Sequence, residues 1–137
     1  MQFKTLDDAM LVSVQIAPEQ VADAAALGVT MIVNNRPDGE EPGQPAGAGI
    51  AAAADAAGIG YRHIPVAGGF APDQVDAMAE ALEAAEGKVL AFCKSGTRST
   101  FLWALAEKQR GGDGAAILEK AAGAGYDLSP LRLHLLR

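Results

Sequence analysis

The sequence predicts an α/β fold in which a central parallel four-stranded sheet is flanked by helices. Short apolar runs alternate along the chain with longer helical patterns, which is the order of parallel strands joined by crossover helices. The apolar runs are rich in β-branched residues, as expected for strands buried on both faces. The 137 residues are 50% hydrophobic, enough for one buried core and too few for two, so we expect a single domain over residues 1–137.

Four segments have the length and composition of strands. They are Met10–Val14, Val29–Asn34, Tyr61–Val66 and Lys88–Phe92. Pro65 cannot donate a ladder hydrogen bond, so it belongs at the end of the third strand or at an edge of the sheet.

Helical patterns fill most of the remaining chain. They cover residues 17–27, 48–57, 73–86, 100–110, 115–122 and 128–136. Pro18 suits the first turn of the first helix, and Gly28 is a plausible residue to end it. Residues 35–47 contain three prolines and three glycines, so they are predicted to form a loop.

Charge and composition exclude several classes of function. Seventeen acidic residues against 11 Lys and Arg give a net charge of −6, which disfavours nucleic acid and anionic membrane surfaces as partners. The lone Cys93 excludes an internal disulfide, and with His63 and His134 it leaves too few ligands for a structural zinc site. We expect no metal and no cofactor. The chain has no long apolar run and no signal-peptide pattern at its start, so a cytoplasmic location is expected.

The segment after the last predicted strand carries the chemistry. In parallel sheets the active site lies beyond the carboxyl ends of the strands. Here the chain continues as Cys93-Lys94-Ser95-Gly96-Thr97-Arg98-Ser99, followed by a helix. Loop N–H groups, the helix dipole and the Arg98 guanidinium would together favour a thiolate over a thiol. We predict Cys93 and Arg98 as catalytic residues. The predicted anion-binding residues are Lys94, Ser95, Gly96, Thr97 and Ser99.

A purely structural role for Cys93 is the alternative. A lone cysteine at the end of an apolar strand is most often a small core residue. The glycine, the arginine and three hydroxyls within six positions favour the functional interpretation.

The loop after the second predicted strand lies on the same edge of the sheet. Its Arg36-Pro37-Asp38-Gly39-Glu40 segment is equally consistent with a polar turn and with a part of the site. Arg36 and Asp38 are predicted as accessory residues, with Arg36 either paired with Asp38 or assisting anion binding. Asp38 and Glu40 are the carboxylates of this loop that could reach the site.

The Cys93–Ser99 segment resembles the catalytic loop shared, in variants, by cysteine-dependent phosphatases and rhodaneses. More specifically, the segments 13–16, 34–40 and 63–66 resemble the beta-lactamase hydrolase-like proteins, phosphatase-like domain family. The resemblance extends from about Thr5 to Leu136. It implies a cysteine-phosphatase-like fold whose loop binds an anion or a transferable sulfur.

Three departures from the phosphatase pattern favour sulfur chemistry. Four residues separate Cys93 from Arg98, as is common in rhodaneses, where phosphatases have five. The segment from Val66 to Pro72 lacks the acid that phosphatases use to protonate the leaving group. Phe92 replaces the histidine that usually precedes the phosphatase cysteine.

The expected function is therefore a rhodanese-type sulfurtransferase. Sulfane sulfur would pass from thiosulfate or a persulfide through a Cys93 persulfide to a thiol acceptor. The first alternative is a tyrosine or dual-specificity-type phosphatase that hydrolyses a phosphoester through a phosphocysteine intermediate. The second is a non-catalytic module that binds phosphate or another anion.

Overall fold

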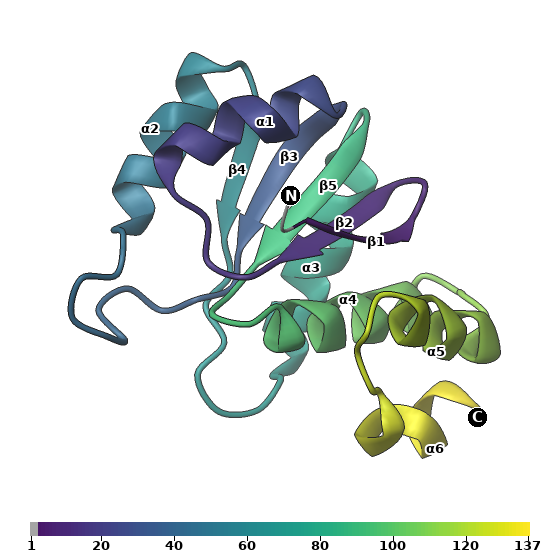
Figure 1. Ribbon diagram of the computed structural model, residues 1–137. Helices are drawn as coiled ribbons and strands as arrows, with labels where there is room; N and C mark the ends of the chain where they lie inside the picture. Colours follow the sequence, from purple (N-terminus) through teal and green to yellow (C-terminus); the bar gives the residue numbers. More distant parts are fainter. Residues whose placement is uncertain (1–2) are drawn as a thin grey trace.

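The computed structural model describes residues 3–137, which form one five-stranded sheet between two layers of helices (Figure 1). The strands lie in the order β1-β2-β5-β3-β4. Their bounds are Lys4–Asp7 for β1, Met10–Ser13 for β2, Val29–Asn34 for β3, Gly60–His63 for β4 and Lys88–Phe92 for β5. Strands β2, β5, β3 and β4 are parallel to one another, and β1 pairs with β2 in the antiparallel direction.

The register of the sheet brings three strand ends to the same level. Phe92, the last residue of β5, pairs with Ser13 of β2 on one side and with Asn34 of β3 on the other. The backbone N–H of Asn35 continues this ladder by donating to the Phe92 carbonyl at 2.8 Å. The loops after β2, β3 and β5 therefore leave the sheet side by side, and Cys93 begins the central one.

Helices cover both faces of the sheet (Figure 1). One face carries the short 3₁₀ helix η1 (Pro18–Gln20) with α1 (Val21–Ala26) and α2 (Gly47–Ala56). The other face carries α3 (Pro72–Ala84) and α4 (Thr97–Gln109), with α5 (Gly114–Gly123), η2 (Ser129–Leu131) and α6 (Arg132–Leu135) packed around them. Within residues 3–137, no helix combines the length and the apolar run that crossing a bilayer requires.

The core consists of two apolar clusters, one on each face of the sheet. Leu11, Ile32 and Leu90 pack in the cluster under α1 and α2. Their chain neighbours Val12, Val33 and Ala91 belong to the cluster on the opposite face, which also contains Trp103 of α4. Because successive side chains of a strand point to opposite faces, strands buried on both faces need continuous apolar runs. This explains why these strands were recognisable in the sequence.

The predicted α/β architecture is confirmed, and the structure adds a fifth strand to the four that were predicted. In β1 only Leu6 is buried, whereas the Lys4 and Thr5 side chains are exposed. Such a short edge strand has no apolar run by which it could be recognised. It is defined by its antiparallel pairing with β2.

Two other boundaries differ where the chain enters or leaves the site. Strand β4 ends at His63, before Pro65, which removes a backbone donor. Helix α4 begins at Thr97, three residues before the predicted start at residue 100. Residues Thr97 to Ser99 therefore form the first turn of a helix, where backbone N–H groups have no intrahelical acceptor.

Candidate active site

Cys93 lies at the bottom of the loop between β5 and α4. Its side chain is fully buried, and the backbone N–H of Gly96 donates to its Sγ at 3.1 Å. Gly96 precedes α4 with φ of +91° and ψ of −10°, a left-handed conformation in which glycine is strongly preferred. The loop turns back on itself at this residue. The sulfur consequently faces the first turn of α4, whose N–H groups and dipole favour negative charge.

The three predicted loop hydroxyls separate into two groups. The Ser95 Oγ donates to the Thr97 Oγ1 at 3.0 Å, and both side chains lie on the exposed side of the loop. The Ser99 Oγ is buried and, among the described residues, has no hydrogen-bond partner. An unpaired buried hydroxyl is costly, and an anion-binding role for Ser99 stays a prediction.

Arg98 is held by two acceptors, the Glu40 carboxylate and the Val66 carbonyl. Its Nη1 donates to the Glu40 Oε2 at 2.7 Å and to the Val66 carbonyl at 2.7 Å, and its Nη2 donates to the Glu40 Oε1 at 3.0 Å. A guanidinium has five N–H groups in a planar fork. Three are used by these bonds. The Nε–H and the second Nη2–H form the other edge of the fork, whose geometry matches two oxygens of an anion.

The bond to Glu40 is the main cause that raises the pKa of Arg98 above its ordinary value. Cys93 contributes in the same direction. The causes of the Arg98 pKa shift thus include Cys93 as well as Glu40, and a catalytic role for the two residues stays a prediction.

Glu40 connects the two arginines of the site. Besides Arg98, its Oε1 accepts from the Arg36 Nε at 2.9 Å. The hydrogen bonds to Arg98 and then to Arg36 lower the pKa of Glu40 from 4.5 to about 2. Glu40 is therefore ionised at neutral pH and has no proton to donate to a leaving group.

The other loop residues join the site in a way that sequence reasoning did not resolve. Arg36 is buried and bonds to Glu40, to the Glu41 Oε1 at 2.6 Å and to the Gln15 Oε1 at 3.1 Å. Asp38 instead accepts the backbone N–H of Gly47 at 2.8 Å, at the start of α2. The Arg36–Asp38 ion pair that the sequence suggested is therefore not formed. Arg36 pairs with Glu40 and Glu41 instead, and Asp38 caps α2.

Lys94 lies at the rim of the site. Its side chain is 62% exposed, and its Nζ forms an ion pair with the Glu41 Oε1 at 2.9 Å. This pair is the main cause that lowers the pKa of Glu41. Lys94 can therefore attract anions but does not itself form the bottom of the site.

Tyr126, from the segment after α5, also contacts the loop and was not singled out in the sequence. Its Oη donates to the Ser95 carbonyl at 3.1 Å. No local motif surrounds Tyr126, and the contact spans 31 positions. Nothing in the sequence pattern therefore connects it with Cys93.

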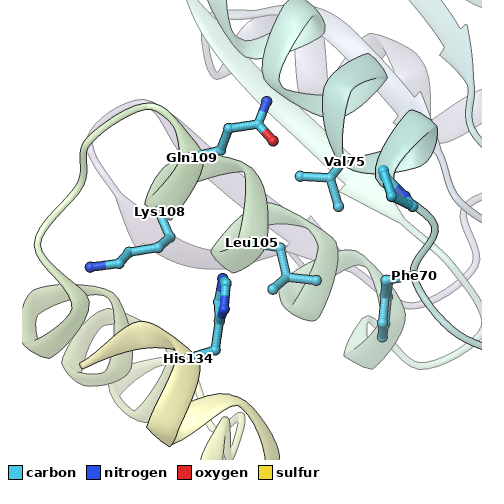
Figure 2. A pocket seen from close by; sticks show the side chains of 7 residues that line it. Phe70, Val75, Leu105, Lys108, Gln109 and His134 are labelled. Atoms are coloured by element: carbon cyan, nitrogen blue, oxygen red, sulfur yellow. The ribbon is translucent and has the colours of Figure 1, made fainter. Parts of the chain in front are cut away.

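A separate cavity of about 470 Å³ lies between α3, α4 and α6 (Figure 2). It is lined by Phe70, Pro72, Val75, Leu105, Lys108, Gln109 and His134. These residues belong to the later turns of α4 and to its neighbours, and none belongs to the Cys93–Ser99 loop. The candidate site is therefore distinct from this cavity.

Known proteins resemble this chain in sequence and, among solved structures, in fold. The family model described as beta-lactamase hydrolase-like protein, phosphatase-like domain, matches residues 2–111. A beta-lactamase hydrolase-like protein of Xylella fastidiosa (strain Temecula1) is 38% identical over 108 residues, which are 78% of this chain and 25% of that protein. The chain thus spans about a quarter of the length of the curated relative that it matches.

Among solved structures, a candidate phosphatase from Neisseria meningitidis Z2491 superposes with a TM-score of 0.83 at 33% identity, covering 98% of this chain and 96% of that one. P. aeruginosa TpbA, solved in complex with phosphotyrosine, has a TM-score of 0.59 at 22% identity and covers 94% of this chain and 86% of that one.

These comparisons contradict the predicted sulfurtransferase and give no support to its thiol acceptor. The matching family is phosphatase-like, and the Neisseria structure, whose match covers almost the whole of both chains, is described as a candidate phosphatase. The prediction relied on the four residues between Cys93 and Arg98 as a measure of the size of the anion site. Because α4 begins at Thr97, Arg98 lies in the first helical turn and not in an extended loop, so the number of residues between Cys93 and Arg98 does not by itself measure the size of the site. Since the family model matches residues 2–111 of the 137, the chain belongs to the family of the beta-lactamase hydrolase-like protein, phosphatase-like domain.

Proposed function

We propose that this domain hydrolyses phosphomonoesters through a covalent intermediate on Cys93. The observation that carries the proposal is the pairing of two features around one sulfur. The Gly96 N–H donates to the Cys93 Sγ, and the Arg98 guanidinium, held by Glu40, interacts with the same cysteine. A thiolate nucleophile next to a fork that binds two oxygens is suited to attack on a phosphoryl group.

The reaction takes place in two displacements. In the first, the Cys93 thiolate attacks phosphorus, and the bond from phosphorus to the ester oxygen breaks with its electron pair leaving on that oxygen. Arg98 and the first-turn N–H groups of α4 hold the non-bridging oxygens, whose charge is retained through the transition state. In the second, the oxygen of a water molecule attacks phosphorus, the S–P bond breaks with its electron pair returning to sulfur, and the thiolate and dihydrogen phosphate, which keeps both protons of the water, are released.

Aryl phosphates are the proposed substrate class. Glu40 is ionised at neutral pH because its pKa is about 2, and Asp38 is engaged in capping α2. A substrate whose leaving group is a stable phenolate needs less help from a general acid than an alkyl ester does. The phosphotyrosine bound to TpbA, a protein with the same fold, supports this choice.

Hydrolysis of p-nitrophenyl phosphate by the purified chain tests the proposal. We expect turnover that inorganic phosphate inhibits competitively and that exceeds turnover of glycerol phosphate. Cys93→Ser is expected to lower kcat by at least ~10³-fold, because the hydroxyl is a much weaker nucleophile at neutral pH. Arg98→Lys is expected to lower kcat/KM roughly 100-fold, because a lysine cannot offer a planar pair of donors.

Arg110→Lys is the matched control for Arg98→Lys. Arg110 follows the other end of α4 and pairs with Glu107 and Glu83 at the surface, so its replacement is expected to leave turnover unchanged. Turnover that survives in Cys93→Ser would overturn the proposal. So would phosphate binding without any hydrolysis of aryl phosphates, which is the outcome expected of a non-catalytic module.

A further inference from the structure

A single peptide group links Tyr126 to the sulfur of Cys93. The Tyr126 Oη donates to the Ser95 carbonyl at 3.1 Å, and the N–H of the same peptide, carried by Gly96, donates to the Cys93 Sγ at 3.1 Å. Peptide groups of the described residues are all trans. In a planar trans peptide the C=O and the N–H point in opposite directions. The phenol and the sulfur therefore bind the two ends of one rigid unit.

We propose that Tyr126 is a positioning residue that holds the Ser95–Gly96 peptide with its N–H directed at Cys93, which favours the thiolate form of this cysteine. The inference deepens the proposed function, because the thiolate is the nucleophile of that reaction.

The peptide needs such an anchor because Gly96 is on one side of it. Glycine has access to both signs of φ, so the peptide before it rotates more easily than others do. Rotation by half a turn would direct the Ser95 carbonyl at the sulfur, where its partial negative charge would oppose a thiolate. The bond from Tyr126 is lost in that rotated state, so the phenol stabilises the orientation with the N–H toward the sulfur.

The direction of each hydrogen bond is unambiguous. A carbonyl oxygen can only accept, so Tyr126 must donate, and this requires a protonated phenol. Burial and then the negative charge of Cys93 raise the pKa of Tyr126 above its ordinary value of 10.0, so the proton is retained at neutral pH. A donor at the C=O also polarises the peptide and strengthens the bond that its N–H makes, since linked hydrogen bonds reinforce one another.

The backbone around Tyr126 holds the ring in place. The Tyr126 N–H donates to the Ala121 carbonyl of α5 at 2.9 Å, and the ring packs against the core cluster that contains Trp103. The contact with the loop is close, because a Cβ built on Gly96 would collide with the Tyr126 hydroxyl. Both the phenol and its acceptor are thus confined to one arrangement.

Tyr126→Phe tests the proposal, because it removes one oxygen and keeps the ring. Cys93 is the only cysteine of the chain, so iodoacetamide alkylation reports on this sulfur alone. At about pH 6 we expect alkylation of the variant to be roughly threefold slower than that of the parent, and at high pH the two rates are expected to converge. kcat/KM for p-nitrophenyl phosphate is expected to fall by a similar factor at the lower pH.

Tyr61→Phe is the control, because Tyr61 is the other tyrosine of the chain and its hydroxyl bonds to Asn34. This variant is expected to keep the parental alkylation profile. Superimposable pH profiles for Tyr126→Phe and the parent would overturn the inference, as would a uniform slowing at every pH, which would indicate a structural role. The alkylation profile does not depend on turnover. The inference about Tyr126 therefore remains testable if aryl phosphates are not hydrolysed.

Discussion

Glu40 orients both arginines of the site through one carboxylate. Its two oxygens accept from Nη1 and Nη2 of Arg98, and one of them also accepts from Nε of Arg36. The carboxylate binds the Nη1–Nη2 edge of the Arg98 guanidinium, and the edge with Nε is the one proposed to bind the ligand. Its effect on anion binding is therefore to position the arginine rather than to block it.

Glu40→Gln is expected to lower kcat/KM for p-nitrophenyl phosphate roughly tenfold, mainly through KM. The amide keeps the shape of the carboxylate but loses its charge and cannot accept from both nitrogens of Arg98, and hydrogen bonds to charged groups are worth about 1.5–3 kcal/mol. Glu41→Gln is the control, since Glu41 is 48% exposed and its loss is expected to change kcat/KM by less than about threefold. Equal effects of the two substitutions would contradict the positioning role.

Glu40→Gln and Glu41→Gln also isolate the contribution of the Glu40 carboxylate to the free energy of unfolding at acidic pH. Folding lowers the pKa of this carboxyl from 4.5 to about 2, so the folded state binds its proton less readily than the unfolded state does. This contribution to the free energy of unfolding is therefore fully present above about pH 4.5 and is lost as the pH falls toward 2. Urea unfolding is measured at about pH 5 and pH 3. Between these pH values, the free energy of unfolding is expected to fall less in Glu40→Gln than in Glu41→Gln. Identical losses of stability in the two variants would contradict this prediction.

At the scale of elements, the start of α4 determines the shape of the site. Gly96 turns the chain from β5 into α4, directs its own N–H at the sulfur, and accepts from the N–H and the hydroxyl of Thr100 at 3.0 and 2.8 Å. The strand end, the loop and the first helical turn are thus one connected unit. A change at this glycine is expected to affect both the fold of the loop and the anion site.

Gly96→Ala is expected to lower turnover at least tenfold and to destabilise the domain by more than ~1–2 kcal/mol. The left-handed conformation alone costs an alanine about that much, and the added Cβ also collides with the Tyr126 hydroxyl. Gly111→Ala is the control, because Gly111 has φ of +94° just after the other end of α4 and open space around it. Gly111→Ala is expected to lower the free energy of unfolding by a similar conformational cost and to leave turnover unchanged. Turnover assays and urea unfolding of both variants check the prediction.

At the scale of the whole molecule, the segments after α4 complete the core and supply Tyr126. Leu135 of α6 is fully buried in the cluster that contains Trp103, whereas Leu133, two positions before it, is 82% exposed. The C-terminal segments therefore pack on α4 and α5 as part of one core. Their packing places Tyr126 against Ser95, in the loop that precedes the N-terminal end of α4.

Leu135→Ala is expected to lower the free energy of unfolding by about 2–4 kcal/mol, because it leaves a cavity in this core. Leu133→Ala is expected to change it by less than about 0.5 kcal/mol. Trp103, the single tryptophan, is buried and provides the fluorescence signal for urea titrations of both variants. A domain whose C-terminal segments were merely appended would show equal, small effects for the two substitutions.

The predictable parts of the fold are those that depend on residues adjacent to one another in the chain. The bounds of β3 and β5 agree with their predictions, because both strands are apolar runs buried on two faces. The Cys93–Ser99 loop was recognisable for the same reason, since its cysteine, glycine and arginine are neighbours in the chain. Strand β1 was missed because its pairing with β2, rather than its own composition, makes it a strand.

The sequence by itself determined the alternation of strands and helices, the loop at the end of the central strand, and the identity of its cysteine and arginine. Only the tertiary structure decided which carboxylate holds Arg98 and which hydroxyl holds the Ser95–Gly96 peptide. These contacts join residues 58 and 31 positions apart. Local patterns reflect backbone geometry over a few residues, whereas partners at such separations are selected by the register of the sheet and the packing of the helices.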